Sequence, residues 1–250
     1  MRGTRSRCCG RVEYATVGAS SPRLYSHAVS FTADSLALPV FPLTGTLLLP
    51  GNYLPLNVFE ERYRNMVADV LDADRTLGMI QPKLPGPDNF GVADEERPDL
   101  YSVGCAGRIE ECEAQADGRY LIVLKGTCRF RVRSELETHR GYRRVIAGFD
   151  EFVHDLRATA EVIDRELLLA AVVRFSREHG LDFDQELLDS LPSVNLLHAV
   201  SAALPFEPAE KQALLEATSA TERQETLLAL MGMGLDLRTD ETDFTPPVVH

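Results

Sequence analysis

The chain contains two regions that differ in the spacing of their hydrophobic residues. Across residues 38–149, apolar residues come in short runs or alternate with polar ones, as Cys128, Phe130 and Val132 do with arginines. This period-two alternation, interrupted by prolines and glycines, is typical of short β-strands. From Asp155 onward, apolar residues recur every three to four positions, the spacing of amphipathic helices. The pattern therefore predicts an α+β fold, with a β-rich segment followed by a helical one.

The β-rich segment contains one clear helix signal. Asn57 with Glu60 three residues later forms a capping-box pattern, so a helix is predicted to begin there and run to Leu71. Asp117 and Gly118 predict a hairpin turn. Residues 81–100, rich in prolines and acids, predict a loop. The predicted strands are the short runs before residue 57, then 77–80, 103–109, 120–124, 128–132 and 143–149.

The helical segment is divided by glycines and prolines. A long helix is predicted from Asp155 to Gly180. Ser219 with Glu222 forms a second capping-box pattern, and the helix that it begins is predicted to end before Gly232. The other predicted helices span 185–191, 193–203 and 208–217.

The two ends of the chain differ from the centre. Residues 1–33 hold five arginines and one acid, without the apolar stretch of a secretory signal. They are interpreted as a disordered leader; a mitochondrial or plastid transit segment and a misassigned start codon are the alternatives. The predicted organisation is a leader at 1–35, a β-rich domain at 36–153, a helical bundle at 154–235 and a disordered tail at 236–250.

Charge and cysteine content narrow the function classes. The 26 Lys and Arg residues stand against 38 Asp and Glu, a net charge of −12, which disfavours general nucleic-acid or anionic-membrane binding. The longest aliphatic run, Leu167 to Val173, is far shorter than the ~20 residues of a membrane span. Five cysteines without a C-x-x-C pair indicate a reducing, cytoplasmic setting, with Cys105 and Cys128 as buried strand residues.

Recognisable catalytic patterns are missing from the sequence. It has no phosphate-binding P-loop, no dinucleotide-binding glycine motif, no H-E-x-x-H and no G-x-S-x-G. We therefore assign no catalytic residue, no cofactor and no metal ligand. The alternative is an unrecognised enzyme that uses scattered carboxylates or His154, which a deep pocket with strongly shifted ionisable groups would favour.

Three arginines form a possible basic stripe. Arg129, Arg131 and Arg133 share one face of a predicted strand, where they would steer a phosphate or an acidic peptide. The opposing interpretation is that nearby acids neutralise them across the sheet, and the acidic composition favours it. The acids considered as partners are Glu110, Glu111 and Glu113.

Several short segments together resemble the N-terminal domain of the Lon protease family. They occur in the same order as in that domain and cover about residues 36–235. The segments are LPVFPL (38–43), LLPG (48–51), LPL (54–56), FEERY (59–63), VGCAGRI (103–109), DGRY (117–120), KGTCRFRV (125–132) and EKQALLE (210–216).

This resemblance implies a fold and a role. The implied fold is a PUA-like β-barrel followed by a helical bundle. In Lon this module engages substrate polypeptides, whereas the ATPase and the Ser-Lys peptidase follow it, so neither activity carries over. The implied function is non-catalytic binding of unfolded polypeptide or of a specific protein partner, such as a protease or chaperone, as an adaptor in protein quality control. RNA binding is the alternative, because PUA-like barrels elsewhere bind RNA.

A contact surface is predicted beside the Pro50-Gly51 turn. Tyr53 and Leu54 follow this turn, and Phe90 lies in the long loop. These three apolar side chains are the candidate peptide-binding or partner-binding residues.

Overall fold

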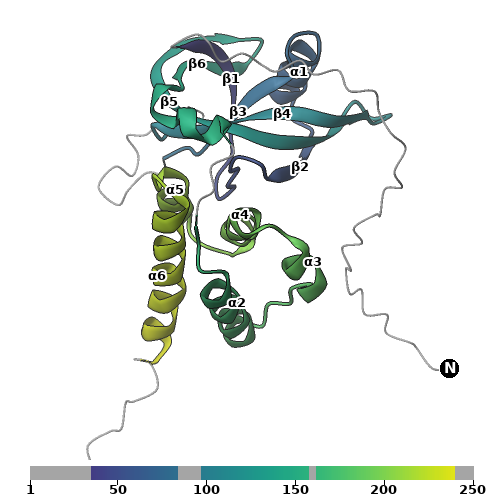
Figure 1. Ribbon diagram of the computed structural model, residues 1–250. Coiled ribbons are helices and arrows are strands. Elements are labelled where there is room, and N and C mark those ends of the chain that lie inside the picture. Colours follow the sequence, from purple (N-terminus) through teal and green to yellow (C-terminus); the bar gives the residue numbers. More distant parts are fainter. Residues whose placement is uncertain (1–34, 84–96, 158–161, 240–250) are drawn as a thin grey trace, which may run out of the picture. The chain divides into compact units, whose positions relative to one another are not determined.

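The computed structural model describes residues 35–83, 97–157 and 162–239, all of which belong to one compact unit of the chain (Figure 1). Apart from Ser35, the predicted leader lies outside these residues, as does the tail beyond Thr239. The division at residue 153 remains a prediction.

In the residues that the structure describes, six strands form one closed sheet. Its order is β2-β5-β4-β3-β1-β6, and β5 also pairs with β6. This last pairing closes β5, β4, β3, β1 and β6 into a barrel and leaves β2 on its edge. The fold is therefore α+β, as predicted. The strands are β1 (Leu36–Pro42), β2 (Tyr53–Val58), β3 (Thr76–Ile80), β4 (Val103–Ala114), β5 (Tyr120–His139) and β6 (Tyr142–Gly148).

Apolar side chains from every barrel strand fill the interior. Phe130 of β5 is fully buried at its centre, and its ring lies so close to β4 that a Cβ on Gly104 would come within 2.5 Å of it. Cys105 and Cys128 are completely buried free thiols on β4 and β5, which confirms their predicted positions. Burial raises the pKa of both thiols and keeps them protonated.

β5 is longer than its sequence indicated. The prediction of two strands separated at Gly126 is wrong, because β5 continues through this glycine as one strand of 20 residues. Gly126 instead permits a close approach of the turn that precedes β2. Its N–H donates to Asn52 O at 2.8 Å, and its own carbonyl accepts the N–H of Gly51 at 2.9 Å. A Cβ on Gly126 would lie 2.1 Å from Leu49 O, so no side chain fits.

We expect Gly126→Ala to lower the free energy of unfolding by about 1–3 kcal/mol, because the added methyl group must displace backbone. The matched control is Gly232→Ala in the last helix, where a Cβ meets nothing within 4 Å and alanine favours helix by about 0.5–1 kcal/mol. Urea unfolding of both variants tests this. Equal stability of the two variants would contradict the account of Gly126.

The first helix begins later than predicted. Asn57 pairs with Leu121 in the sheet, so α1 (Glu61–Leu71) follows β2 instead of starting within it. The pairing of β2 with β5 continues to Val58, so the strand extends through the residues that the capping-box pattern would place at the start of a helix. Phe59, which follows the strand, is 63% exposed. The helix buries the face that the spacing predicted, through Tyr63, Met66, Val67 and Val70.

The helices within residues 165–239 lie below the barrel in Figure 1. The predicted long helix from Asp155 is wrong: the chain forms a 3-10 helix first, and α2 begins only after Asp164, whose side chain accepts the N–H of Leu167. α2 ends at Gly180 as predicted, in a left-handed conformation. The elements are η2 (Asp150–Leu156), α2 (Arg165–His179), α3 (Gln185–Ser190), α4 (Ser193–Ala203), α5 (Pro208–Glu216) and α6 (Ala220–Thr239).

α6 begins at the predicted place but does not end there. Ser219 Oγ accepts the N–H of Glu222 at 3.1 Å, as a capping box requires, although the Glu222 carboxylate accepts from Thr218. The helix passes Gly232, because a single glycine costs a helix only about 1 kcal/mol. None of the described helices combines the length and apolar character needed to cross a bilayer.

Candidate functional site

β2, β5 and β4 lie side by side and carry one exposed surface, which we call the ribbon face. Directly paired residues point to the same side of a sheet, as do alternate residues along a strand. Two rows therefore cross the three strands on one face. These rows are Pro55–Val123–Glu111 and Asn57–Leu121–Glu113.

A groove of about 540 Å³ runs along these strands. Besides the six side chains of the ribbon face, it is lined by Leu56, Cys112 and Ile122. Leu121 remains 42% exposed, although it is a large aliphatic side chain. Both glutamates are exposed. The groove thus combines an accessible apolar strip with carboxylates along its β4 side, a combination typical of protein-binding surfaces.

The structure separates the predicted contact residues. Tyr53 is 61% exposed and shares a strand face with Pro55, and Lys125 Nζ lies 5.4 Å from the centre of its ring. Leu54 is half-buried on the opposite face and pairs with the buried Leu124. Phe90 lies outside the described residues. Tyr53 therefore extends the ribbon face, and Leu54 does not. Their roles in binding remain predictions.

Sequence reasoning missed the central part of this face. Residues 121–124 are all apolar, so the run includes both sides of β5. An apolar run of this kind is expected for a strand buried on both faces. Here one face of β5 is open to solvent. Because the run is apolar on both faces, Leu121 and Val123 are accessible on the open one.

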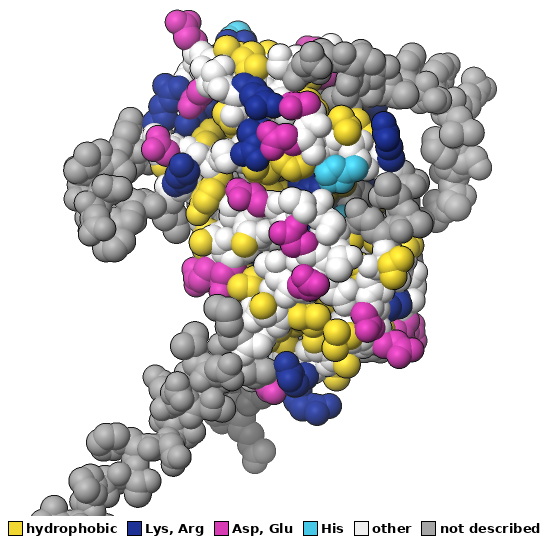
Figure 2. Space-filling view, turned by 60° about the vertical axis from the view of Figure 1, so that its left-hand side comes forward, with side chains coloured by type: hydrophobic (Ala, Val, Ile, Leu, Met, Phe, Trp, Pro, Cys, Tyr) yellow, Lys and Arg dark blue, Asp and Glu magenta, His cyan; other side chains and the backbone are white. Residues whose placement is uncertain are grey.

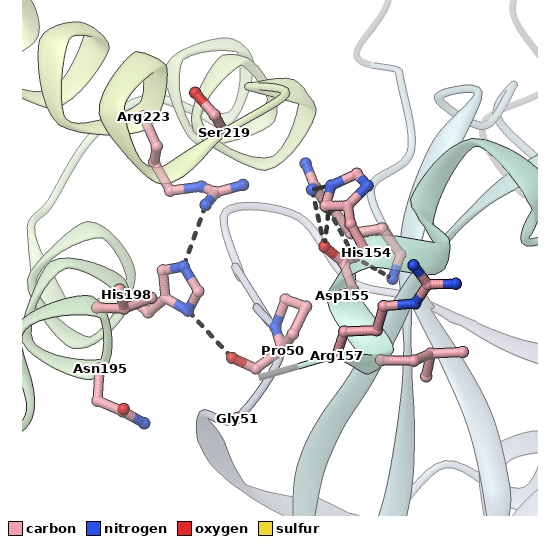
Figure 3. A pocket seen from close by; sticks show the side chains of 12 residues that line it. Pro50, Gly51, His154, Asp155, Arg157, Asn195, His198, Ser219 and Arg223 are labelled. Carbon is pink, nitrogen blue, oxygen red and sulfur yellow. Dashed lines mark hydrogen bonds and ion pairs between the residues drawn. The ribbon is translucent and has the colours of Figure 1, made fainter. Parts of the chain in front are cut away.

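A second cavity, of about 360 Å³, lies where the barrel meets the helices (Figure 3). Arg129 of β5, only 2% exposed, lies at its wall. Its Nε and Nη2 donate to the two carboxylate oxygens of Asp155, both at 2.9 Å. Nη1 donates to the carbonyls of Leu215 and Ala217, and Nη2 also approaches His154 Nε2 at 2.9 Å. One buried guanidinium therefore connects β5, η2 and the end of α5.

Arg223 of α6 lines another part of this cavity. Its Nε donates to Leu214 O and its Nη2 to Ala217 O, the same carbonyl that Arg129 uses. Its Nη1 lies 3.1 Å from His198 Nε2, and His198 Nδ1 lies 3.0 Å from Pro50 O (Figure 3). An arginine can only donate and a carbonyl can only accept, so His198 carries its proton on Nδ1 and is neutral.

Burial, and then the charge of Arg223, lower the pKa of His198 to about 4. Burial alone would raise the pKa of Asp155, but the hydrogen bonds and charge of Arg129 outweigh it and lower that pKa. His154, His198 and the carboxylate of Asp155 therefore all contact an arginine, and His198 also contacts a backbone carbonyl. This arrangement stabilises the junction and leaves His198 without a ring nitrogen for proton transfer. In the described residues, no group of His, Cys, Asp and Glu side chains is arranged to hold a metal ion.

The three arginines singled out from the sequence are neutralised, but not by the expected acids. Glu110, Glu111 and Glu113 lie at the other end of the β4–β5 hairpin, whereas η2 folds back beside the arginines. Basic and acidic side chains are accordingly interleaved on the barrel in Figure 2. The ion pairs are Arg129–Asp155 at 2.9 Å, Arg131–Glu151 at 2.7 Å and Arg133–Asp150 at 2.5 Å. The three arginines of the predicted basic stripe are therefore paired with acids of the same chain.

Comparison with known proteins identifies the class to which this fold belongs. The family model of the ATP-dependent protease La (LON) substrate-binding domain matches residues 37–232. The chain therefore belongs to the LON substrate-binding domain family, which confirms the resemblance seen in the sequence.

Individual relatives support this assignment. The Lon protease of Escherichia coli K12 is 26% identical over 212 residues, which cover 82% of this chain and 26% of that protein. Lon protease 2 of Myxococcus xanthus is 26% identical over 206 residues, covering 78% and 23%. The chain thus spans about a quarter of the length of these relatives, and the region that it shares with them is the substrate-binding domain.

Solved structures show the same fold. A Lon N-terminal domain protein from Xanthomonas campestris superposes with a TM-score of 0.55 at 26% identity, covering 78% of this chain and 98% of that one. The N-terminal domain of Lon protease from the Mycobacterium avium complex superposes with a TM-score of 0.54 at 20% identity, covering 79% and 98%. The barrel and the helices therefore form a known domain.

Proposed function

We propose that this chain acts as a non-catalytic binding domain that holds polypeptide segments on the ribbon face, as an adaptor in protein quality control. One observation carries the proposal: a domain of the LON substrate-binding family has an accessible apolar groove along β2, β5 and β4. The other cavity is lined in part by charged and polar groups that hydrogen-bond one another, whereas the apolar strip of the groove faces outward. The groove therefore favours apolar segments of a protein chain.

The chemistry of the groove suits weak binding of many sequences. Contact with Leu121, Val123 and Pro55 removes apolar surface from water, which depends on area and not on a particular side chain. An unfolded segment also loses conformational freedom when it binds, which offsets much of this gain. We therefore expect micromolar affinity for unfolded polypeptides. A protease or chaperone that presents an exposed apolar segment is the alternative partner, and the free cysteines support a cytoplasmic setting.

We expect Leu121→Gln to weaken the binding of a labelled, permanently unfolded polypeptide roughly tenfold, because burial of one leucine contributes about 1.5 kcal/mol. The measurement is fluorescence anisotropy at physiological salt. Leu167→Gln on α2 is the matched control, since Leu167 is 49% exposed and lies on a different part of the domain. Wild-type affinity in the control and reduced affinity in Leu121→Gln would support the ribbon face.

Two outcomes would contradict the proposal. Equal loss in both variants would mean that binding uses scattered apolar surface, and an absence of binding by the wild type would remove unfolded polypeptide as the ligand. Turnover of ATP or peptide by the purified chain would contradict its non-catalytic character.

A further inference from the structure

We propose that the ribbon face selects apolar segments that carry lysine or arginine beside the apolar residues. This inference rests on the proposed function, because it names the class of polypeptide that the same groove prefers. It starts from the position of Glu111 and Glu113, which line the groove from β4 beside the apolar residues of β5.

The two carboxylates are accessible for a partner. Both glutamates are exposed, and neither forms an ion pair or a hydrogen bond with another described side chain. This distinguishes them from Glu135 of β5 and Glu151 of η2, two carboxylates that arginines neutralise. Two neighbouring carboxylates therefore lie at the side of the groove without a basic partner among the described side chains.

The register places each carboxylate beside an apolar side chain. Glu111 pairs with Val123 and Glu113 pairs with Leu121, and the two glutamates, two residues apart on one strand, are separated by roughly 7 Å. A chain that lays an apolar side chain against Leu121 or Val123 thus brings its neighbouring residues close to a carboxylate. A basic neighbour would gain an ion pair, whereas an acidic neighbour would meet repulsion.

The charge of the whole chain acts in the same direction. A net charge of −12 attracts a cationic segment from a distance and repels an anionic one. Lys125 lies at the Tyr53 end of the strands, in contact with the ring of Tyr53, so this basic side chain and the two glutamates lie at different ends of the ribbon face. The preference is therefore expected to depend on these two carboxylates more than on total charge.

Three labelled peptides with the same apolar centre test this inference. Their flanking residues are lysine, glutamine or glutamate, and anisotropy measures their affinity at low and at high salt. We expect the lysine peptide to bind on the order of fivefold more tightly than the glutamine peptide, and the glutamate peptide more weakly still. Salt should reduce these differences, because exposed charges are screened.

The decisive variant is Glu111→Gln/Glu113→Gln. We expect it to lose most of the wild type's preference for the lysine peptide, measured as the ratio of its affinities for the lysine and the glutamine peptides. The matched control, Glu166→Gln/Glu178→Gln, removes the same charge from exposed residues of α2 and should keep the preference. Equal loss in both double variants would show that net charge alone is responsible and overturn the inference.

The two proposals fail in different ways. If the wild type binds all three peptides equally, the ribbon face still binds polypeptide and only the preference for basic segments is wrong. If none of the peptides binds, the proposed function itself is wrong, and the inference is overturned with it.

Discussion

Arg129→Met is expected to lower the free energy of unfolding by about 3–5 kcal/mol, the cost of removing one partner from a buried ion pair. The side chains of Arg129 and Asp155 are only 2% and 6% exposed, so the carboxylate would remain buried without its counter-charge. The carbonyls of Leu215 and Ala217 would also lose a donor. Chemical denaturation followed by circular dichroism measures the loss.

Arg131→Met is the matched control on the same strand. Its pair with Glu151 is about one-third exposed on both sides, so its loss is expected to cost less than about 1 kcal/mol. A double variant, Arg129→Met/Asp155→Leu, should recover part of the stability, because it removes the buried charge as well as its partner. If Arg129→Met and Arg131→Met were equally stable, the junction would not depend on the buried pair.

Acidification from pH 6.5 to pH 4 is expected to destabilise the domain through His198 by on the order of 3 kcal/mol. The pKa of His198 falls from its ordinary 6.5 to about 4 in the folded domain, because burial and the charge of Arg223 oppose protonation. The unfolded chain therefore binds the proton more readily. The stabilising contribution is complete above pH 6.5 and is lost as the pH falls toward 4.

The groups around His198 determine its pKa and therefore the pH range in which it destabilises the domain. Arg223 and, farther away, Arg129 oppose its protonation, whereas the Pro50 carbonyl and Asp155 favour it. The pKa of Asp155 is itself lowered, so its contribution is present above the ordinary value of 3.8 and is lost only in more acidic solution. The two groups thus act in successive pH ranges.

His198→Gln separates these contributions. The variant is expected to be less stable at neutral pH but to show a much shallower decline between pH 6.5 and pH 4, since glutamine does not titrate. The measurement is the free energy of unfolding in urea at several pH values across this range. An unchanged slope in the variant would assign the pH dependence to other groups.

The sequence predicted those parts of the fold that depend on neighbouring residues. Alternation identified the strands of the barrel, and Gly180 identified the end of α2, because a left-handed residue there suits glycine. The start of α1 was wrong for the opposite reason. Asn57 satisfies a local capping pattern, but its distant partner Leu121 holds it in the sheet.

The candidate sites depend on contacts between distant residues. Arg129 was correctly expected to pair with an acid, but Asp155 is 26 residues away, and the Ala217 carbonyl is 88 residues away. No local pattern brings those groups together. Tyr53 was singled out because it follows a turn, and its role in binding remains a prediction. Leu121 was not singled out, because a run of apolar neighbours is typical of a strand buried on both faces.

Pro55 has a consequence for how this chain behaves in concentrated solution. The hydrogen bond from Gly126 to Asn52 O makes Pro55–Val123 a non-bonded pair, because bonded and non-bonded pairs alternate between antiparallel strands. The proline nitrogen therefore faces the outer edge of β2, where another residue would offer an N–H. A second copy that approaches this edge finds one backbone N–H missing from the row along β2. The missing donor opposes edge-to-edge stacking into fibres. The domain is thereby able to expose apolar side chains on β2 while protecting the same strand against self-assembly.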